Sequence, residues 1–177
     1  MTRLLALAML VILASVCLAD DVSDYLTRDG TLKDELVFSV ALTSNKPPTW
    51  DGTTWRVKPS GEWEGTWGRI KDPVGKGKLS EKQIQALAQS LATNEFSKLP
   101  RLLGEKGDAR IQAVVSIRMG DKESSFYMTS NRYDYVGQTA EDAKNWHRFV
   151  ALELLIRDML KIKKAWPIDQ DADPGKK

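Results

Sequence analysis

Hydrophobic residues alternate with polar or small residues in three parts of the chain, and each alternation predicts β-strand. Residues 35–43 read ELVFSVALT, which predicts a single strand with small residues on its second face. Residues 53–67 read TTWRVKPSGEWEGTW and predict a hairpin, because the Pro-Ser-Gly sequence at 59–61 suits a three-residue loop. Residues 111–128 predict a second hairpin, which turns at the Gly-Asp pair of residues 120–121.

The register of the first hairpin follows from its charges and its aromatic residues. Opposite charges meet across the loop in two pairs: Lys58 with Glu62, and Arg56 with Glu64. The other face then carries the uncharged set: Thr53, Trp55, Val57, Trp63 and Trp67. Gly65 falls opposite Trp55, whose ring can cover the bare backbone of a strand glycine. This pattern is typical of a half-buried ribbon, so we interpret the rings as its inner face. A Trp platform that binds a ligand is the alternative interpretation.

Two further segments carry apolar residues at helical spacing. A capping box of Ser80 and Gln83 predicts the start of the first helix, and an apolar stripe runs over residues 84–91. A longer helix is predicted over about residues 140–164, and Thr139 can cap its start.

The order of elements predicts the fold class. Residues 68–78 are rich in Lys and Gly and are predicted as a loop, so the order is strand, hairpin, helix, hairpin and long helix. This order predicts an α+β fold: a single antiparallel sheet of about five strands with two helices packed on one face. The domain is predicted over residues 35–166. A flexible lead-in is expected at residues 20–34 and a disordered tail at residues 167–177.

The start of the chain predicts a secretory signal peptide over residues 1–19. Arg3 provides a positive start, residues 4–16 form an apolar run too short to favour a membrane span, and cleavage is expected after Ala19. An uncleaved anchor is one alternative. A lipoprotein acylated at Cys17 is another, although the residues before this cysteine match a lipoprotein signal poorly. We therefore expect a secreted or periplasmic protein with no membrane span after cleavage.

Composition narrows the function classes. Cleavage removes the only cysteine, so we expect neither a disulfide nor a thiolate metal site in the mature chain. The leader holds one basic and no acidic residue, which leaves 25 basic and 24 acidic residues among the remaining 158 of 177. A balance this even argues against a nucleic-acid partner. The remaining length fits one domain with a sizeable core.

No familiar catalytic or metal-binding arrangement is found in the sequence. His147 is the only histidine, and neither metal ligands nor a nucleophile are spaced to work with it. The Gly-Lys-Gly at residues 75–77 lacks the spacing of a phosphate-binding loop, and residues 169–175 lack the Gly required inside a calcium loop. We expect no cofactor, no bound metal and no enzymatic activity. A hydrolase with an unrecognised site is kept as an alternative.

The candidate partner-binding residues lie in two predicted loops that are rich in aromatic side chains. Trp50 follows a Pro-rich segment and lies outside the pairing of the first hairpin. The second loop, residues 131–138, contributes four candidates: Arg132, Tyr133, Asp134 and Tyr135. Trp, Tyr and Arg are enriched at positions that dominate binding energy. We expect these residues to contact another exported protein.

Residues 79–100, LSEKQIQALAQSLATNEFSKLP, follow a strand pair and precede IQAVVSIRMGDKESSFYMTS at residues 111–130. This order resembles the emfourins, small ββαββα proteins that inhibit thermolysin-like metallopeptidases. The likeness covers about residues 36–160 and rests on the order of elements and on the Phe-x-x-Leu-Pro exit of the helix. The chain departs from the family in its secretion signal and its Trp-rich first hairpin. It equally resembles uncharacterised secreted bacterial α+β domains.

The resemblance implies a non-catalytic domain that binds protein. The leading hypothesis is therefore an exported, non-enzymatic, protein-binding domain, with peptidase inhibition as one form of that activity. A glycan-binding or envelope-binding module that uses its Trp residues is the alternative. The pattern of residues makes no prediction of oligomeric state.

Overall fold

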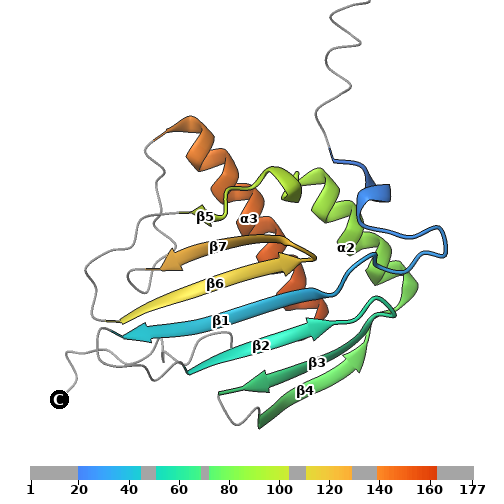
Figure 1. The fold of residues 1–177 in the computed structure, drawn as a ribbon, viewed down its shortest axis with the longest axis horizontal. Helices are drawn as coiled ribbons and strands as arrows, with labels where there is room; N and C mark the ends of the chain where they lie inside the picture. The colour runs from blue at the N-terminus through green and yellow to red at the C-terminus, as the bar shows by residue number, and fades with distance from the viewer. Residues whose placement is uncertain (1–19, 45–50, 69–71, 104–110, 129–138, 163–177) are drawn as a thin grey trace, which may run out of the picture.

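A computed structural model describes the chain over residues 20–44, 51–68, 72–103, 111–128 and 139–162. The strands form one seven-stranded sheet in the order β4-β3-β2-β1-β6-β7-β5. Their bounds are β1 (Leu36–Ser44), β2 (Asp51–Val57), β3 (Glu62–Trp67), β4 (Asp72–Lys78), β5 (Leu102–Leu103), β6 (Ile111–Met119) and β7 (Lys122–Met128). The helices α2 (Glu81–Thr93) and α3 (Ala140–Met159) lie behind the sheet on one face (Figure 1). The expected leader and the expected tail lie outside the described residues.

The prediction of a sheet of about five antiparallel strands is wrong, although the α+β class holds. The sheet has seven strands and is mixed, because β5 pairs with β7 in parallel while the other neighbours pair antiparallel. β4 lies in the segment predicted as a loop. It reads DPVGKGK, with glycine where a strand usually carries an apolar side chain, so the alternation is missing. β5 has two residues and is too short to produce a pattern.

Both predicted hairpins are confirmed together with their registers. In the first, Thr53 pairs with Trp67, Trp55 with Gly65, Arg56 with Glu64 and Val57 with Trp63. In the second, Arg118 pairs with Glu123 and Val115 with Phe126. Strand β1 lies between β2 and β6, so it joins the two hairpins into one sheet. Gly61 closes the first loop with a φ of 81°, a conformation that other residues rarely adopt.

The helices begin at the predicted capping residues. Ser80 and Gln83 form a reciprocal capping box at the start of α2, and Thr139 and Asp142 form one at the start of α3. α3 ends at Met159, earlier than the predicted end at residue 164. The described residues also form two short 3₁₀ helices, η1 (Val22–Asp24) and η2 (Phe96–Lys98).

The core lies between the sheet and the two helices. The sheet contributes Phe38, Val40, Trp55, Val57, Val115, Ile117 and Phe126, and the helices contribute Ile84, Leu87, Leu91, Trp146, Phe149, Leu152 and Ile156. The rings of Phe126 and Trp146 have centroids 4.3 Å apart, which joins β7 to α3. Removal of this apolar surface from water is the main term that favours the folded state.

Residues 20–34, expected as a flexible lead-in, contribute two side chains to this core. Tyr25 is 6% exposed and Leu32 is 1% exposed. The Asp20 carboxylate accepts hydrogen bonds from the Ser97 N–H at 2.9 Å, from the Ser97 hydroxyl at 2.5 Å and from the Tyr25 hydroxyl. The Leu32 N–H also donates to the Pro59 carbonyl at 3.1 Å. This segment therefore packs against the sheet and the helices.

The Asp20 contacts predict that stability depends on pH. Burial raises the pKa of Asp20, but hydrogen bonds from Ser97 and Tyr25 outweigh it, and the net pKa lies below the ordinary value of 3.8. A pKa that is depressed by folding stabilises the protein above the unfolded-state pKa, and this contribution is lost as the pH falls through the folded-state pKa. The free energy of unfolding of the Asp20→Asn variant at neutral pH is therefore expected to be lower than that of the wild-type chain by up to about 1 kcal/mol.

Urea unfolding followed by circular dichroism, at neutral pH and at about pH 3, checks this prediction. The difference in free energy of unfolding between the variant and the wild-type chain should narrow at the lower pH, because this pH lies below the ordinary pKa of 3.8 and the unfolded chain then binds a proton more readily than the folded chain does. An equal difference at both pH values would show that the charge on Asp20 is not what stabilises the contact.

Candidate functional site

The candidate site lies on the helix-side face of β3 and β4. Trp63 and Trp67 point to this face because they pair directly with Val57 and Thr53, and Val57 is buried in the core. Trp63 is half-buried, and Trp67 is 43% exposed. We use the name Trp shelf for the surface formed by Trp63, Trp67, Val74, Gly75 and Gly77.

The shelf is open because of where β3 and β4 lie in the sheet. These two strands form one edge, whereas α3 lies behind the central strands (Figure 1). Trp55, one strand nearer the centre, is only 6% exposed. The same face of the hairpin is therefore core at Trp55 and solvent-exposed surface at Trp67.

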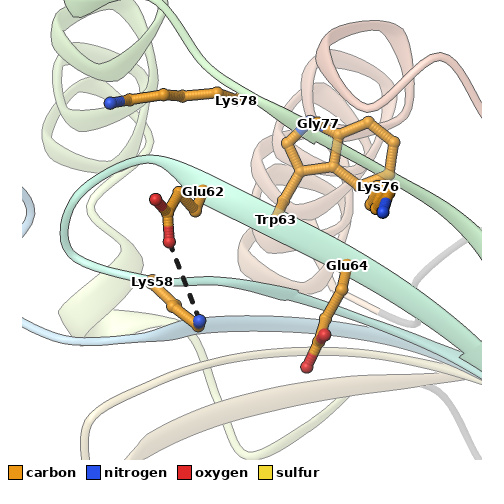
Figure 2. A pocket seen from close by; sticks show the side chains of 7 residues that line it. All are labelled: Lys58, Glu62, Trp63, Glu64, Lys76, Gly77 and Lys78. Carbon is orange, nitrogen blue, oxygen red and sulfur yellow. Dashed lines mark ion pairs between the residues drawn. The ribbon is translucent and has the colours of Figure 1, made fainter.

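The glycines of β4 make room for the Trp63 ring. A Cβ added at Gly77 would lie 2.8 Å from Nε1 of Trp63, and one at Gly75 would lie 3.4 Å from its Cζ3. Figure 2 shows the ring lying beside Gly77 on the neighbouring strand. The indole therefore covers bare backbone and takes the place of the side chains that β4 lacks.

Val74 adds an aliphatic group to the shelf through a bulge. Gly65 pairs with Gly75 and Thr66 pairs with Pro73, so Val74 is the extra residue on β4. Its Cγ2 lies 2.8 Å from the position that a Cβ on Gly65 would occupy, which places the side chain on the helix-side face. Val74 is 49% exposed. The shelf thus presents both aromatic and aliphatic surface to solvent.

The opposite face of the same strands is charged. The register forms two rows of alternating sign across the sheet: Arg56, Glu64 and Lys76, then Lys58, Glu62 and Lys78. Lys58 and Glu62 form an ion pair at 3.7 Å (Figure 2), and Arg56 pairs with Glu35 at 3.0 Å. Such exposed pairs each contribute less than about 1 kcal/mol to stability. Their larger effect is a regular pattern of charge that ends at the β4 edge.

All five candidate partner-binding residues from the sequence lie outside the described residues: Trp50, Arg132, Tyr133, Asp134 and Tyr135. The structure therefore does not place them relative to the Trp shelf. Sequence reasoning assigned Trp63 and Trp67 to the inner face and missed that Trp67 is exposed. One signal in the sequence could have predicted that residues 75–78 pair with residues 62–64. The lysines of the Gly-Lys-Gly-Lys run can lie opposite the two glutamates of Glu-Trp-Glu, and a glycine can lie opposite the large Trp63.

The other notable polar residues are an exposed histidine and two acidic residues that form ion pairs within the fold. His147 is exposed on α3. Glu153 is buried on α3 and forms an ion pair with Arg157 at 3.0 Å, one helical turn away. Glu95 forms an ion pair with Lys98 at 2.8 Å and another with Arg148, which links η2 to α3.

In the part of the chain that the structure describes, no three His, Cys, Asp or Glu side chains are grouped as a metal site requires. None of the helices in that part has the length and apolar composition of a membrane span. No family model matches the chain, and a search of curated proteins finds no match. The resemblance to the emfourins therefore stays a prediction.

Proposed function

We propose that this chain is an exported, non-enzymatic domain that binds another protein through its Trp shelf. The observation that carries the proposal is the exposure of Trp67, at 43%, and of Val74, at 49%, on the same face of an edge hairpin. Trp is strongly enriched among the residues that dominate binding energy at interfaces.

The class of partner follows from the sequence resemblance. A likeness to emfourins favours an exported metallopeptidase of the thermolysin type, which the domain would inhibit. This form of the proposal is tested directly by measuring hydrolysis of a peptide substrate by thermolysin with increasing amounts of the chain. Inhibition that is lost in a Trp67→Ala variant would connect the shelf to the resemblance.

The broader proposal is tested by capture of partners from the cell envelope, with two matched variants. Trp67→Ala removes the exposed ring, and Leu154→Ala removes an exposed apolar side chain on α3, which is 56% exposed and lies outside the shelf. We expect the wild-type chain and the Leu154→Ala variant to retain the same protein, and Trp67→Ala to retain at least tenfold less. Equal retention by all three proteins would rule out the shelf as the binding surface.

A glycan-binding module is the second candidate, and the exposure of Trp67 on the same face as Trp63 favours it, since exposed rings can pack against sugars. Soluble cell-wall glycan fragments added to the chain distinguish the two functions. Quenching or enhancement of Trp fluorescence that disappears in Trp67→Ala would support the glycan reading. The absence of any change, together with protein capture, would support the protein partner.

A further inference from the structure

Within the described part of the chain, the backbone groups on the outer edge of β4 have no pairing strand. β4 is the last strand in the sheet order, and no described residue pairs with its outer side. The Leu79 N–H donates to the Gly61 carbonyl at 2.9 Å, so the backbone of Leu79 points toward β3. Backbone groups in a strand point to alternate sides, so Gly77 also bonds to β3. The N–H and C=O of Lys76 and Lys78 therefore point to the free edge.

The side chains along this edge define what can pair with it. Each charged row across the polar face ends in an exposed lysine, Lys76 in one row and Lys78 in the other. A strand added at this edge continues both rows, and opposite charges directly across a sheet are favourable. On the helix-side face, Gly75 and Gly77 leave space, and the Trp63 ring lies over them. An added strand therefore meets lysines on one face and an indole on the other.

We propose that the outer edge of β4 binds an extended segment of a partner protein in which acidic and apolar residues alternate. The segment adds a strand to the seven-stranded sheet. Its acidic side chains pair with Lys76 and Lys78, and its apolar side chains pack against Trp63. This inference rests on the proposed function and specifies the chemistry of the partner.

A second copy of this chain fits the edge less well. Antiparallel pairing of two β4 edges would bring Lys76 and Lys78 opposite lysines of the other copy, and like charges across a sheet are unfavourable. Pro73 and the bulge at Val74 interrupt the start of the strand, as is common at edges that avoid pairing with themselves. The same lysines that oppose self-pairing attract an acidic segment.

The test uses fluorescence anisotropy with the purified full chain and two labelled peptides of eight residues. One alternates Glu and Val, and the other has four Glu followed by four Val, so that composition is equal and only the alternation differs. We expect the alternating peptide to bind at least tenfold more tightly. No binding of the alternating peptide, or equal binding of the two, overturns the proposal.

Two substitutions at Lys76 separate the backbone contribution from the charge. Lys76→Ala removes the charge and keeps the N–H, whereas Lys76→Pro removes both. Because this N–H points away from β3, proline here leaves the β3–β4 hydrogen bonds in place, as is typical of edge strands. We expect Lys76→Pro to bind the alternating peptide at least tenfold more weakly than Lys76→Ala, with both variants folded by circular dichroism.

Other results identify other occupants or a different mode. Equal binding by the two Lys76 variants, with partner capture still lost in Trp67→Ala, would show that the shelf binds without strand addition, so that only this inference fails. If peptide binding is equal in the two Lys76 variants and partner capture is also unchanged in Trp67→Ala, the proposed function fails as well. If the wild-type chain forms dimers and Lys76→Pro abolishes them, a second copy of the chain occupies the β4 edge. Tenfold tighter peptide binding after Asp169, Asp171 and Asp173 are changed to Asn would identify the chain's own acidic residues, outside the described part. Either result overturns the proposal.

Discussion

Replacing Trp55 by alanine is expected to lower the free energy of unfolding by about 3–5 kcal/mol. Trp55 is 6% exposed and packs against Phe38 with ring centroids 5.6 Å apart. Its indole also lies directly over Gly65, which has no side chain to fill the space that the ring would leave. The strands around it are held by their backbone pairing and cannot collapse into the cavity. Urea unfolding followed by far-UV circular dichroism measures the loss.

Trp67→Ala is the matched control, since it removes the same side chain from the same face of the neighbouring strand. Trp67 is 43% exposed, so its loss is expected to change stability by less than about 1 kcal/mol. The contrast between the two variants measures how far the core extends along the hairpin. Equal losses would show that Trp67 is part of the core, and the Trp shelf would then not be available to a partner.

The hairpins could be predicted from the sequence in detail because their patterns are local. Charge pairs such as Arg56 with Glu64 and the turn at residues 59–61 restrict the register to one solution, and the structure confirms it. The capping boxes at Ser80 and Thr139 are also local patterns, and the structure confirms that the two helices begin there. These features depend on residues within a few positions of one another.

The exposure of Trp67 could not be predicted in the same way. Alternation shows which side chains share a face, but whether a helix covers that face depends on distant segments. Trp55 and Trp67 share a face and differ in exposure because only the central strands are covered by α3. The interpretation of the rings as the inner face of the hairpin therefore gives the correct side of the sheet for Trp67 but not its exposure.

β4 was not predicted as a strand for a related reason. Its glycines make room for the Trp63 ring of the neighbouring strand, and the sequence of residues 72–78 alone does not reveal this contact. The missing alternation is thus a result of packing between strands. The burial of Tyr25 and Leu32, within the segment expected as a flexible lead-in, likewise depends on contacts with distant parts of the assembled fold.

Gly65→Ala is expected to lower the free energy of unfolding by about 1–3 kcal/mol. Gly75→Ala is expected to leave it unchanged or to raise it by up to about 1 kcal/mol. The two glycines pair directly across β3 and β4. A Cβ at Gly65 would lie 2.7 Å from Cδ1 and Nε1 of Trp55 and 2.8 Å from Cγ2 of Val74, too close for any real contact. A Cβ at Gly75 would lie 3.4 Å from Trp63, an ordinary contact. Urea unfolding of both variants checks this difference.

The double variant Trp55→Ala/Gly65→Ala locates the source of the cost. If the indole is the main obstacle, the second alanine enters space that the first substitution has opened, and it should cost little in that background. The two effects are then non-additive by roughly 1–2 kcal/mol, as expected for residues in direct contact. Strictly additive losses would assign the cost to Val74 and the bulge of β4. In that case the shape of the Trp shelf, rather than the core at Trp55, is what requires glycine at position 65.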